Sequence, residues 1–400
     1  MTSDSPDILI FCGQDWWYHN RAHSDFQLMT RAAKYRKVLL VNSIGMRMPT
    51  PGKSPMPFRR LWRKAKSMLK PACKPLEDRP NYNLMTPILF PFYGSAKARA
   101  FNAWFIRFQV NRMARKLGIV NPHIIVTLPT AWDVAKKMQR SSLAYNRSDK
   151  HSGFSEVDNS LIVRLENELI RNADTVLYCC RNLMESEREM AGERARFLDH
   201  GVDTKHFAAK PPSGAITSLG HPRPIIGFFG GLEHYVVDFD LLERIAKERP
   251  QYSVVLIGDA TLSLDRLKAH PNIHILGFQP YEKIPNYGHD FDISIMPYLN
   301  NDWTRWINPI KLKEYLLLGH EIVAARFGEA EYYADFIHIA DSHEEFINHL
   351  DSVLAGKKAP GDRTALLAKA SWDDRVVELI GVLDGISVKL KGKESPCAAL

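Results

Sequence analysis

Short apolar runs alternate with longer amphipathic segments almost from one end of this 400-residue chain to the other. Each run has the length and continuous apolar character of a strand buried on both faces, and the segments between them have helical periodicity. This alternation predicts an α/β fold of parallel sheets covered by helices on both faces. The runs predicted as strands are residues 8–13, 37–43, 123–129, 142–149, 175–180, 225–231, 252–259, 272–278, 293–299 and 321–325.

The alternation stops once, in a stretch rich in Pro, Gly and Ser at residues 206–222, and then restarts. A chain of this length is too long for one ordinary core, so we expect two domains. The predicted division is a Rossmann-like domain at 1–205, this stretch as the linker, and a second Rossmann-like domain at 223–370. Ligands of such sheets bind beyond the carboxyl ends of the strands, so the two domains would face a central cleft.

The composition is that of a globular protein, with 45% apolar and 24% charged residues and a net charge of +8. Five cysteines without CxxC spacing favour a reducing compartment, without a disulfide framework or a structural zinc. The amino terminus has no basic segment before its short apolar run, so we expect a first strand and no signal peptide. No stretch approaches the roughly 18 apolar residues of a membrane-spanning helix, which predicts a cytosolic protein or one on a membrane surface.

Residues 307–325, INPIKLKEYLLLGHEIVAA, predict a helix followed by a buried strand. Asn308 is expected as the N-cap and Pro309 as the first helical residue, and Gly319 is placed to end the helix. Lys311 and Glu314 lie three residues apart and therefore share one face near the helix N-terminus, where the dipole favours an anion. Lys311 is predicted to bind a phosphate, and Glu314 to accept hydrogen bonds from sugar hydroxyls.

The sequence GFFGGLEH places Gly230 and Gly231 directly after the first predicted strand of the second domain. Neither residue has a Cβ, so the backbone there can approach a phosphate or a base closely. The competing interpretation is a tight turn between a strand and a helix. We favour the ligand interpretation because the helix with Lys311 belongs to the same domain.

In the first domain, Asp149 follows a predicted strand, at the edge of the sheet where ligands bind. A carboxylate at that position can act as a general base for a hydroxyl nucleophile. His151 is the competing base, and a structural role for Asp149 in closing a turn is the alternative to both.

Aromatic and polar residues are crowded into DWWYHNRAHSDF, the first predicted strand-to-helix loop. Asn20, Arg21 and His23 of this loop are candidates for binding an acceptor sugar or the donor phosphates. The alternative is an aromatic lid over the core with ordinary solvated charges.

Two basic, aromatic helical segments are candidates for contact with a membrane. Between residues 53 and 74 there are eight Lys and Arg residues and no acidic residue, and the helical pattern there collects apolar side chains on one face. The predicted membrane-contact residues are Phe58, Arg59, Arg60, Leu61, Trp62 and Arg63. The second segment, residues 95–118, has similar character, but Phe101, Trp104, Phe105 and Phe108 can equally belong to the core.

Two Asp-Phe-Asp stretches, residues 238–240 and 290–292, are the strongest metal candidates in the sequence. Carboxylates are favoured near a helix start, which accounts for the first stretch without a metal. No cluster of hard ligands demands a metal, so we predict no metal and no other cofactor.

The motifs taken together resemble the GT-B glycosyltransferases, specifically the family 4-type and polysaccharide-biosynthesis group. The resemblance covers most of the chain and is carried by HGVDTKHF, IIGFFGGL, VVLIGD, ILGFQPYEKIP, FDISIMPYL, NPIKLKEYLLLGHEIVA and SWDDRV. It implies that the second domain holds the nucleotide sugar and the first holds the acceptor. It also implies that a C-terminal helix, at residues 371–386, crosses back to the first domain, leaving residues 387–400 as a disordered tail.

Two local features bear on the stereochemistry of the expected reaction. Many retaining members of this group carry two glutamates separated by seven residues; Glu314 fits the second position, but the first falls on Trp306. YNRSD followed by KHSGF is instead similar to the acidic-base loop of xanthan-type glucuronosyltransferases, which are inverting and membrane-associated. This similarity implies that Tyr298 and Lys311 contact the donor, that Asp149 deprotonates the acceptor, and that Lys311 stabilises the departing diphosphate.

The sequence therefore predicts a hexosyl- or glucuronosyltransferase that moves a sugar from a nucleotide donor, UDP in the first instance, to a lipid-linked or polysaccharide acceptor. The expected partners are this donor, this acceptor and an anionic membrane surface on the inner face of the cell membrane, and no nucleic acid. The alternatives are a GT-B-fold sugar-nucleotide epimerase and a catalytically inactive scaffold that binds nucleotide sugar or lipid. A nicotinamide-dependent dehydrogenase is less expected because neither half has GxGxxG after its first strand.

Overall fold

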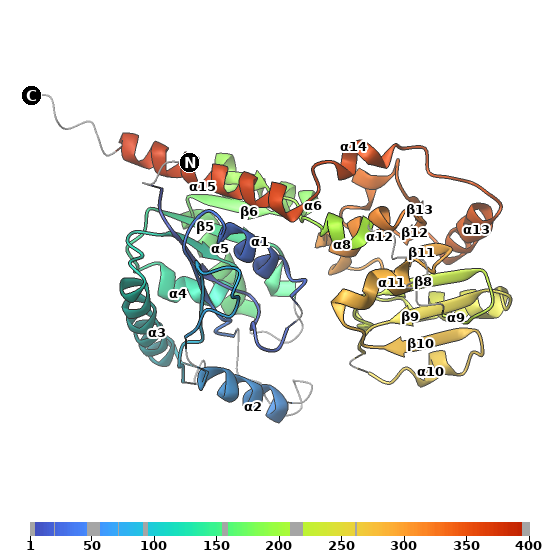
Figure 1. The fold of residues 1–400 in the computed structure, drawn as a ribbon, viewed down its shortest axis with the longest axis horizontal. Coiled ribbons are helices and arrows are strands. Elements are labelled where there is room, and N and C mark those ends of the chain that lie inside the picture. The colour runs from blue at the N-terminus through green and yellow to red at the C-terminus, as the bar shows by residue number, and fades with distance from the viewer. Residues whose placement is uncertain are drawn as a thin grey trace, which may run out of the picture. The chain divides into compact units, whose positions relative to one another are not determined.

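The computed structural model describes residues 5–19, 21–45, 57–70, 72–90, 95–153, 159–208, 219–260 and 262–393, with only the backbone for the helical residues 57–61 and 388–393. The chain divides into two compact units, which Figure 1 shows coloured along the chain. Unit 1 contains residues 1–179, 183–199 and 372–400, and unit 2 contains residues 180–182 and 200–371. The division therefore falls at Asp199 and His200.

The described residues of unit 1 form a seven-stranded parallel sheet in the order β3-β2-β1-β4-β5-β6-β7. Its strands are β1 (Ile8–Phe11), β2 (Val38–Val41), β3 (Tyr82–Met85), β4 (His123–Val126), β5 (Ser142–Arg147), β6 (Thr175–Tyr178) and β7 (Ala195–Phe197). The helices that accompany it are α1 (Ser24–Ala32), α2 (Pro57–Met68), α3 (Ala96–Lys116), α4 (Trp132–Ala135), α5 (Asn159–Asn172), α6 (Arg181–Ser186), α7 (Arg188–Ala191) and α15 (Trp372–Lys393), of which α6 begins in unit 2.

The described residues of unit 2 form a six-stranded parallel sheet in the order β10-β9-β8-β11-β12-β13. Its strands are β8 (Ile225–Phe229), β9 (Ser253–Ile257), β10 (Ile273–Gly277), β11 (Ile293–Met296), β12 (Glu321–Ala325) and β13 (His338–Ala340). Its helices are α8 (Thr204–Ala208), α9 (Phe239–Glu248), α10 (Asp265–Lys268), α11 (Ile284–Gly288), α12 (Ile310–Leu318), α13 (His343–Leu354) and α14 (Arg363–Leu367).

Both sheets reverse their strand order beside the first strand of the unit, between β1 and β4 in unit 1 and between β8 and β11 in unit 2. The central strands β1, β2, β4, β8 and β11 have no exposed residue, as expected for strands covered on both faces. Open parallel sheets bind ligands at the carboxyl ends of the strands beside such a reversal. Each unit therefore has one edge where functional side chains are expected.

All ten predicted strands are present, so the α/β prediction is confirmed. Three further strands, β3, β7 and β13, were not predicted from the sequence. All three lie at an edge of their sheet and have only three or four residues with polar or small side chains among them. Polar residues interrupt β3 and β7, and β13 has only three residues, so none of them has the continuous apolar run that identifies a buried parallel strand.

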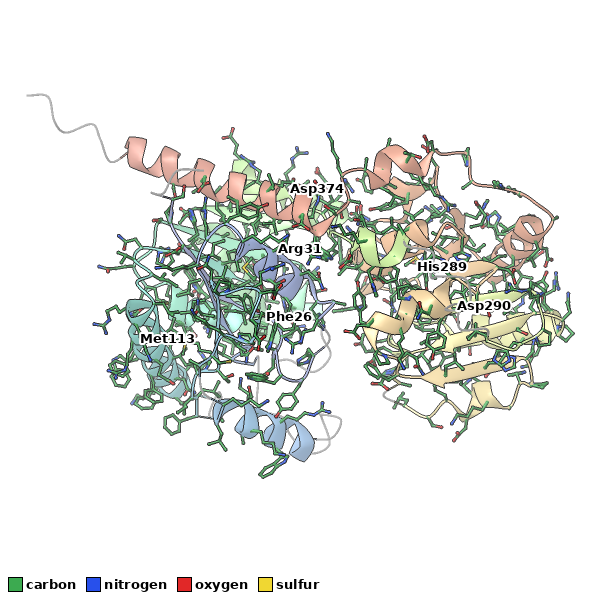
Figure 2. The ribbon with its side chains drawn as sticks, in the orientation of Figure 1. Phe26, Arg31, Met113, His289, Asp290 and Asp374 are labelled. Atoms are coloured by element: carbon green, nitrogen blue, oxygen red, sulfur yellow. The ribbon has the colours of Figure 1, made fainter. Side chains whose placement is uncertain are left out.

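After Ser371 the chain returns to unit 1 as α15, which packs against α1. The start of α15 is held by ion pairs from Arg31 and Lys34 to Asp373, and Figure 2 labels Arg31 beside this helix. The helix runs to Lys393, past the predicted end at residue 386, because its buried side continues through Leu383 and Ser387.

The segment assigned above to the linker also begins later than predicted. Residues 204–208 form α8, and Phe207 is fully buried in the core of unit 2. Residues 206–208 therefore belong to unit 2 and not to a linker. Residues 209–218 of the predicted linker, and residues 394–400 of the predicted tail, lie outside the described residues.

Candidate functional site

The helix α12 begins one residue later than its sequence predicts. Pro309 is the N-cap, with an extended ψ of 123°, and no side chain caps the helix. The prediction of Asn308 as the N-cap is therefore wrong: because Pro309 keeps this extended conformation, its own carbonyl accepts the hydrogen bond from the Leu312 N–H at 3.1 Å. The predicted end is confirmed, since Gly319 has a left-handed φ of 85°.

Lys311, in the first turn of α12, extends over the backbone of Gly230, which follows β8. A Cβ built on Gly230 would lie 2.1 Å from Lys311 Nζ, so a side chain there would displace the ammonium group, and the φ of 139° would strain the backbone of any other residue. The Nζ atom also lies 4.9 Å from the ring centre of Phe228 and 5.8 Å from that of Tyr298. Gly231 makes no comparably close approach.

Burial changes the protonation of the two charged residues on this helix. It lowers the pKa of Lys311 to about 8, although the nearby carboxylate of Glu314 acts in the opposite direction. It raises the pKa of Glu314 to about 7, opposed by the charge of Lys311 and by a hydrogen bond that the Tyr281 hydroxyl donates over 3.3 Å. The free site therefore holds an ammonium and a carboxyl group that both titrate near neutral pH.

Phe228 and Tyr281 were not predicted as members of this site. Phe228 lies on β8 two residues before Gly230, and its residue type gave no signal because every residue of that strand is apolar. Tyr281 lies in ILGFQPYEKIP, a motif that carried the family resemblance without a role for any single residue. Phe228 joins the predicted Tyr298 beside Lys311, and Tyr281 is connected to the predicted Glu314 by its hydrogen bond.

Arg147 organises the loop that contains Asp149 in unit 1. Its guanidinium is 1% exposed and donates hydrogen bonds to the backbone carbonyl of Asp149 at 2.8 Å and to both carboxylate oxygens of Glu187 at 2.8 and 3.2 Å. It also pairs with Glu166, which is buried. The backbone that carries Asp149 is thus fixed by a buried cation between two carboxylates.

The carboxylate of Asp149 accepts a hydrogen bond of 3.4 Å from the Ser148 hydroxyl. Burial raises the pKa of Asp149, although the hydrogen bond from Ser148 and the charge of Arg147 act in the opposite direction. Burial and the charge of Arg147 lower the pKa of His151 to about 3, so this imidazole is neutral at physiological pH. A base with so low a pKa is poorly matched to proton abstraction near pH 7, which favours Asp149 of the two.

Asp25 is the acidic residue that sequence analysis did not select at this edge. It is buried, and it accepts hydrogen bonds from Gly13 N at 3.0 Å, Thr127 Oγ1 at 3.1 Å and Asn146 Nδ2 at 2.9 Å. These donors follow β1, follow β4 and lie on β5, so Asp25 joins three strand ends at the reversal of the sheet. Its only sequence signal was an acidic residue in the first turn of a predicted helix.

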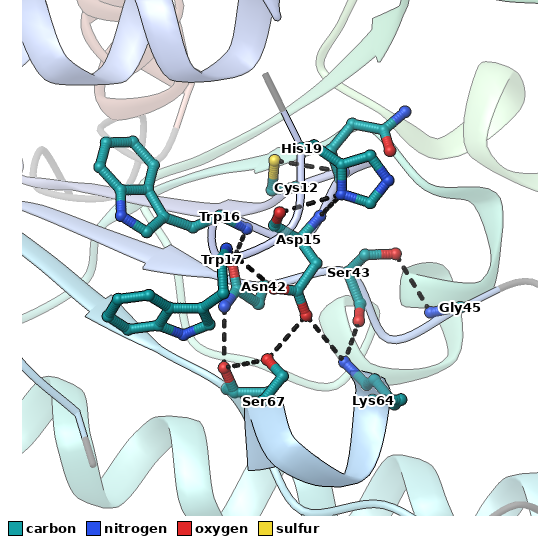
Figure 3. Close-up of polar contacts among 12 residues, drawn as sticks. Cys12, Asp15, Trp16, Trp17, His19, Asn42, Ser43, Gly45, Lys64 and Ser67 are labelled. Atoms are coloured by element: carbon teal, nitrogen blue, oxygen red, sulfur yellow. Dashed lines mark hydrogen bonds and ion pairs between the residues drawn. The ribbon is translucent and has the colours of Figure 1, made fainter. Parts of the chain in front are cut away.

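The loop after β1 is tied to α2 by polar contacts that Figure 3 shows. Asp15 accepts a hydrogen bond of 2.7 Å from Ser67 Oγ and lies 3.8 Å from Lys64 Nζ. The Trp16 N–H donates to Asn42 at 2.9 Å, and the Trp16 ring is buried. Part of this aromatic loop therefore belongs to the core, as the lid alternative anticipated.

The three residues of that loop that were predicted to bind the acceptor or the donor phosphates differ in their contacts. The Arg21 guanidinium lies 3.6 Å from the ring centre of Trp16, and burial lowers its pKa. His23 occupies the N-cap position of α1 without a side-chain capping bond, and burial lowers its pKa to about 4. Asn20 lies outside the described residues.

The most exposed aromatic residues among those described in unit 1 lie on α2 and α3. On α2, Trp62 is 63% exposed and has Lys66 Nζ 5.2 Å from its ring centre. The side chains of Phe58, Arg59, Arg60 and Leu61 are not among those described, and Arg63 lies 5.6 Å from the Tyr18 ring. On α3, Phe101, Trp104 and Phe108 are all about half exposed, so their interpretation as core residues is wrong.

Both Asp-Phe-Asp stretches have structural roles in unit 2. Asp238 caps α9 by accepting a hydrogen bond of 2.9 Å from Leu241 N, and Asp290 accepts one of 2.7 Å from Leu219 N. In the part of the chain that the structure describes, no group of three or more His, Cys, Asp and Glu side chains is placed to hold a metal ion. That the protein uses no cofactor stays a prediction. Among these same residues, no helix is long and apolar enough to cross a membrane.

The two parallel sheets, each with a reversal of strand order beside its first strand, define a chain of two Rossmann-like units. Solved structures of the GT-B type share this architecture along the whole chain. Sucrose-phosphate synthase from Thermosynechococcus elongatus matches 98% of both chains with a TM-score of 0.63 and 14% identity. Anabaena HepE in complex with UDP and glucose covers 98% of this chain and 100% of its own, with a TM-score of 0.60 and 17% identity. The chain therefore has the GT-B fold that its motifs resembled.

One curated sequence is also similar over part of the chain. It is 28% identical over 186 residues and carries the name "Putative teichuronic acid biosynthesis glycosyltransferase TuaH" of Bacillus subtilis (strain 168). The matched region spans 44% of this chain and 46% of TuaH, so less than half of either protein is aligned. No family model matches the chain.

Proposed function

We propose that this protein is a glycosyltransferase that moves a sugar from a UDP-sugar to a lipid-linked or polysaccharide acceptor in bacterial cell-surface or exopolysaccharide biosynthesis. The observation that carries the proposal is the position of Lys311 and Glu314 on α12, with Lys311 Nζ against Gly230 at the ligand-binding edge of unit 2. The partial similarity to TuaH and the likeness to HepE, solved with UDP, support it.

The donor-binding role follows from the chemistry of these groups. A diphosphate at the N-terminus of α12 meets unpaired backbone N–H groups and the ammonium of Lys311, which together stabilise negative charge. Glu314 lies one turn further along and accepts hydrogen bonds from ribose hydroxyls when it is ionised. The same cation stabilises the diphosphate as it leaves.

The transfer is proposed to invert the anomeric centre. Asp149 takes the proton of the acceptor hydroxyl as that oxygen attacks the anomeric carbon, and the bond to the diphosphate breaks. Arg147 acts as a positioning residue, because it holds the backbone carbonyl of Asp149 rather than its carboxylate. We further propose an anionic membrane surface as a partner, with the exposed Trp62 of α2 at the contact, and a location on the inner face of the membrane.

Nucleotide binding provides the first test. At about 100 times its dissociation constant, UDP is expected to add roughly 2.7 kcal/mol to the free energy of unfolding, which thermal melts can detect. GDP, ADP, CMP and NAD at the same concentration are expected to have smaller effects. Lys311→Ala is expected to remove the UDP effect, whereas the exposed Lys268→Ala on α10 retains it. Equal melting temperatures with and without every nucleotide would favour the scaffold alternative.

The titration of Lys311 and Glu314 predicts how the affinity for a UDP-sugar changes with pH. Below about pH 7, Glu314 is protonated, loses its negative charge and becomes a weaker acceptor for ribose hydroxyls; above about pH 8, Lys311 loses its charge. Affinity is therefore expected to peak between these values and to fall up to about tenfold per pH unit on either side. Isothermal titration with UDP-glucose is the suitable measurement, because a free terminal phosphate itself titrates near pH 6.

Two variants test which residue causes the loss of affinity on each side of that pH optimum. Glu314→Gln is expected to flatten the acidic limb, since the amide keeps an acceptor oxygen and does not titrate. Lys311→Arg is expected to flatten the alkaline limb because a guanidinium stays charged. An affinity that does not vary between pH 6 and pH 9 in the unaltered protein would contradict the proposed roles of both residues.

A further inference from the structure

The helix α3 is apolar on two opposite sides. Its inner side is buried and includes Ala103, Ile106 and Val110. Its outer side has Phe101, Trp104 and Phe108, which are 50%, 53% and 51% exposed. A helix on the surface of a globular protein normally carries polar residues outward, so large exposed aromatic side chains in one row indicate a binding surface.

These rings form a continuous, ordered surface, which we call the aromatic face: Ile88, Phe90, Phe101, Trp104, Phe105 and Phe108. The ring centres are 5.6 Å apart for Phe90 and Phe101, 5.7 Å for Phe101 and Trp104, and 6.4 Å for Trp104 and Phe108. Figure 2 shows α3, where Met113 is labelled, at the border of its unit.

Hydrogen bonds fix the short segment that contributes Ile88 and Phe90 to this face. Asn102 binds the backbone N–H and carbonyl of Phe90 at 2.9 and 2.8 Å, and Gln109 binds those of Ile88 at the same two distances. These hydrogen bonds fix the backbone of Ile88 and Phe90 against α3, so the side chains of this segment and of the helix form one apolar surface.

Cations stand at both ends of the aromatic face. Residues 97, 101, 104, 108, 112 and 115 follow one another at three- and four-residue steps, which places them along one side of the helix. Lys97 precedes the aromatic residues, and Arg112 and Arg115 follow them; all three are exposed. The whole helix has six Lys and Arg residues and no acidic residue.

We propose that the aromatic face of α3 binds a lipid surface that carries anionic headgroups. Aromatic side chains favour the boundary between headgroups and acyl chains, and the flanking cations are placed to meet headgroup phosphates. A second copy of this chain is a poor occupant, since two such faces would bring cations against cations at both ends. The inference deepens the membrane partner proposed above, but it requires neither donor binding nor sugar transfer.

Sedimentation of the full chain with lipid vesicles tests the proposal. Vesicles of phosphatidylcholine with phosphatidylglycerol are expected to bind the unaltered protein. Replacing Phe101, Trp104 and Phe108 together by Ser is expected to weaken that binding at least tenfold. The matched control replaces Val163 and Val377, which are exposed on α5 and α15, by Ser and leaves binding unchanged. Thermal melts with UDP check that each variant retains its fold and its nucleotide site.

The cationic residues that flank the aromatic face predict a separate effect on vesicle binding. Arg112→Gln with Arg115→Gln is expected to weaken binding to phosphatidylglycerol vesicles roughly 30-fold, at about fivefold per charge, with little effect on pure phosphatidylcholine. Brominated lipid is expected to quench part of the tryptophan fluorescence, and Trp104→Phe is expected to lose that part.

Three results would overturn the proposal. The first is that the unaltered protein binds no vesicles. The second is that the triple Ser variant binds as well as the control pair while Trp62→Ser on α2 abolishes binding. The third is that sedimentation without lipid reveals a dimer that the triple Ser variant separates, which would assign the aromatic face to self-association. Because none of these measurements uses a sugar donor, failure of the proposed transferase function would be seen separately, in the nucleotide melts.

Discussion

Asp149→Asn is expected to lower the rate of sugar transfer by about 10² to 10⁴-fold and to leave the affinity for UDP unchanged. The amide has the shape of the carboxylate and still accepts a hydrogen bond from Ser148, but it cannot take a proton from the acceptor hydroxyl. Transfer is measured as incorporation of label from a UDP-sugar into the lipid extract of bacterial membranes, using the UDP-sugars that stabilise the protein in thermal melts.

The control for this variant is Asp78→Asn, since Asp78 has an exposed side chain and forms an ion pair with its neighbour Arg79. It is expected to transfer at the unaltered rate. If Asp149→Asn retains transfer within about threefold of the unaltered protein, the inverting mechanism with this base is wrong. Loss of UDP binding in the same variant would point instead to a structural role for Asp149.

The pH dependence of transfer provides a second test of the base. A general base acts in its deprotonated form, so kcat/KM is expected to rise with pH through the pKa of Asp149 in the free enzyme. Because burial raises that pKa in spite of the nearby Ser148 and Arg147, this rise is expected above the usual range for an aspartate. His151 is a weaker candidate, since a base with a pKa of about 3 would give no such rise.

Local sequence patterns predicted an element of this fold well where the pattern allows only one kind of structure. The fully apolar runs became central strands, and Gly319 ended α12 in a left-handed conformation. Lys311 and Glu314 share one side of α12 because a three-residue spacing in a helix leaves few other arrangements. Asn308 failed as the N-cap because the backbone of the proline that follows it remained extended.

The remaining features depend on contacts between distant segments. Asp25 joins the ends of three strands, and its neighbours Thr127 and Asn146 are more than 100 residues away along the chain. The helix α3 is apolar on two sides, so its periodicity alone could not decide which side packs on the sheet. In the structure, the buried Ala103, Ile106 and Val110 identify the side that packs inward, and the exposed Phe101, Trp104 and Phe108 identify the outward side.

Arg147→Met is expected to lower the free energy of unfolding of unit 1 by about 3–5 kcal/mol. Arg147 is fully buried between Glu166 and Glu187, and removing it leaves two carboxylates without their cation in a region from which water is largely excluded. Breaking a buried ion pair from one side is costly for this reason, whereas removing both partners costs less. Arg147→Met combined with Glu166→Gln is therefore expected to recover part of the loss.

Arg164→Met on α5 is the matched control, because Arg164 is exposed and lies 3.9 Å from the carboxylate of Glu168 in an ordinary surface pair. Such pairs contribute at most about 1 kcal/mol. Urea unfolding followed by tryptophan fluorescence suits the comparison, since Trp16, Trp17, Trp62, Trp104, Trp132 and Trp372 lie in unit 1 and only Trp303 and Trp306 in unit 2. Equal unfolding midpoints for the two single variants would show that the Arg147 network does not hold unit 1 together, and the positioning of Asp149 would then need another source.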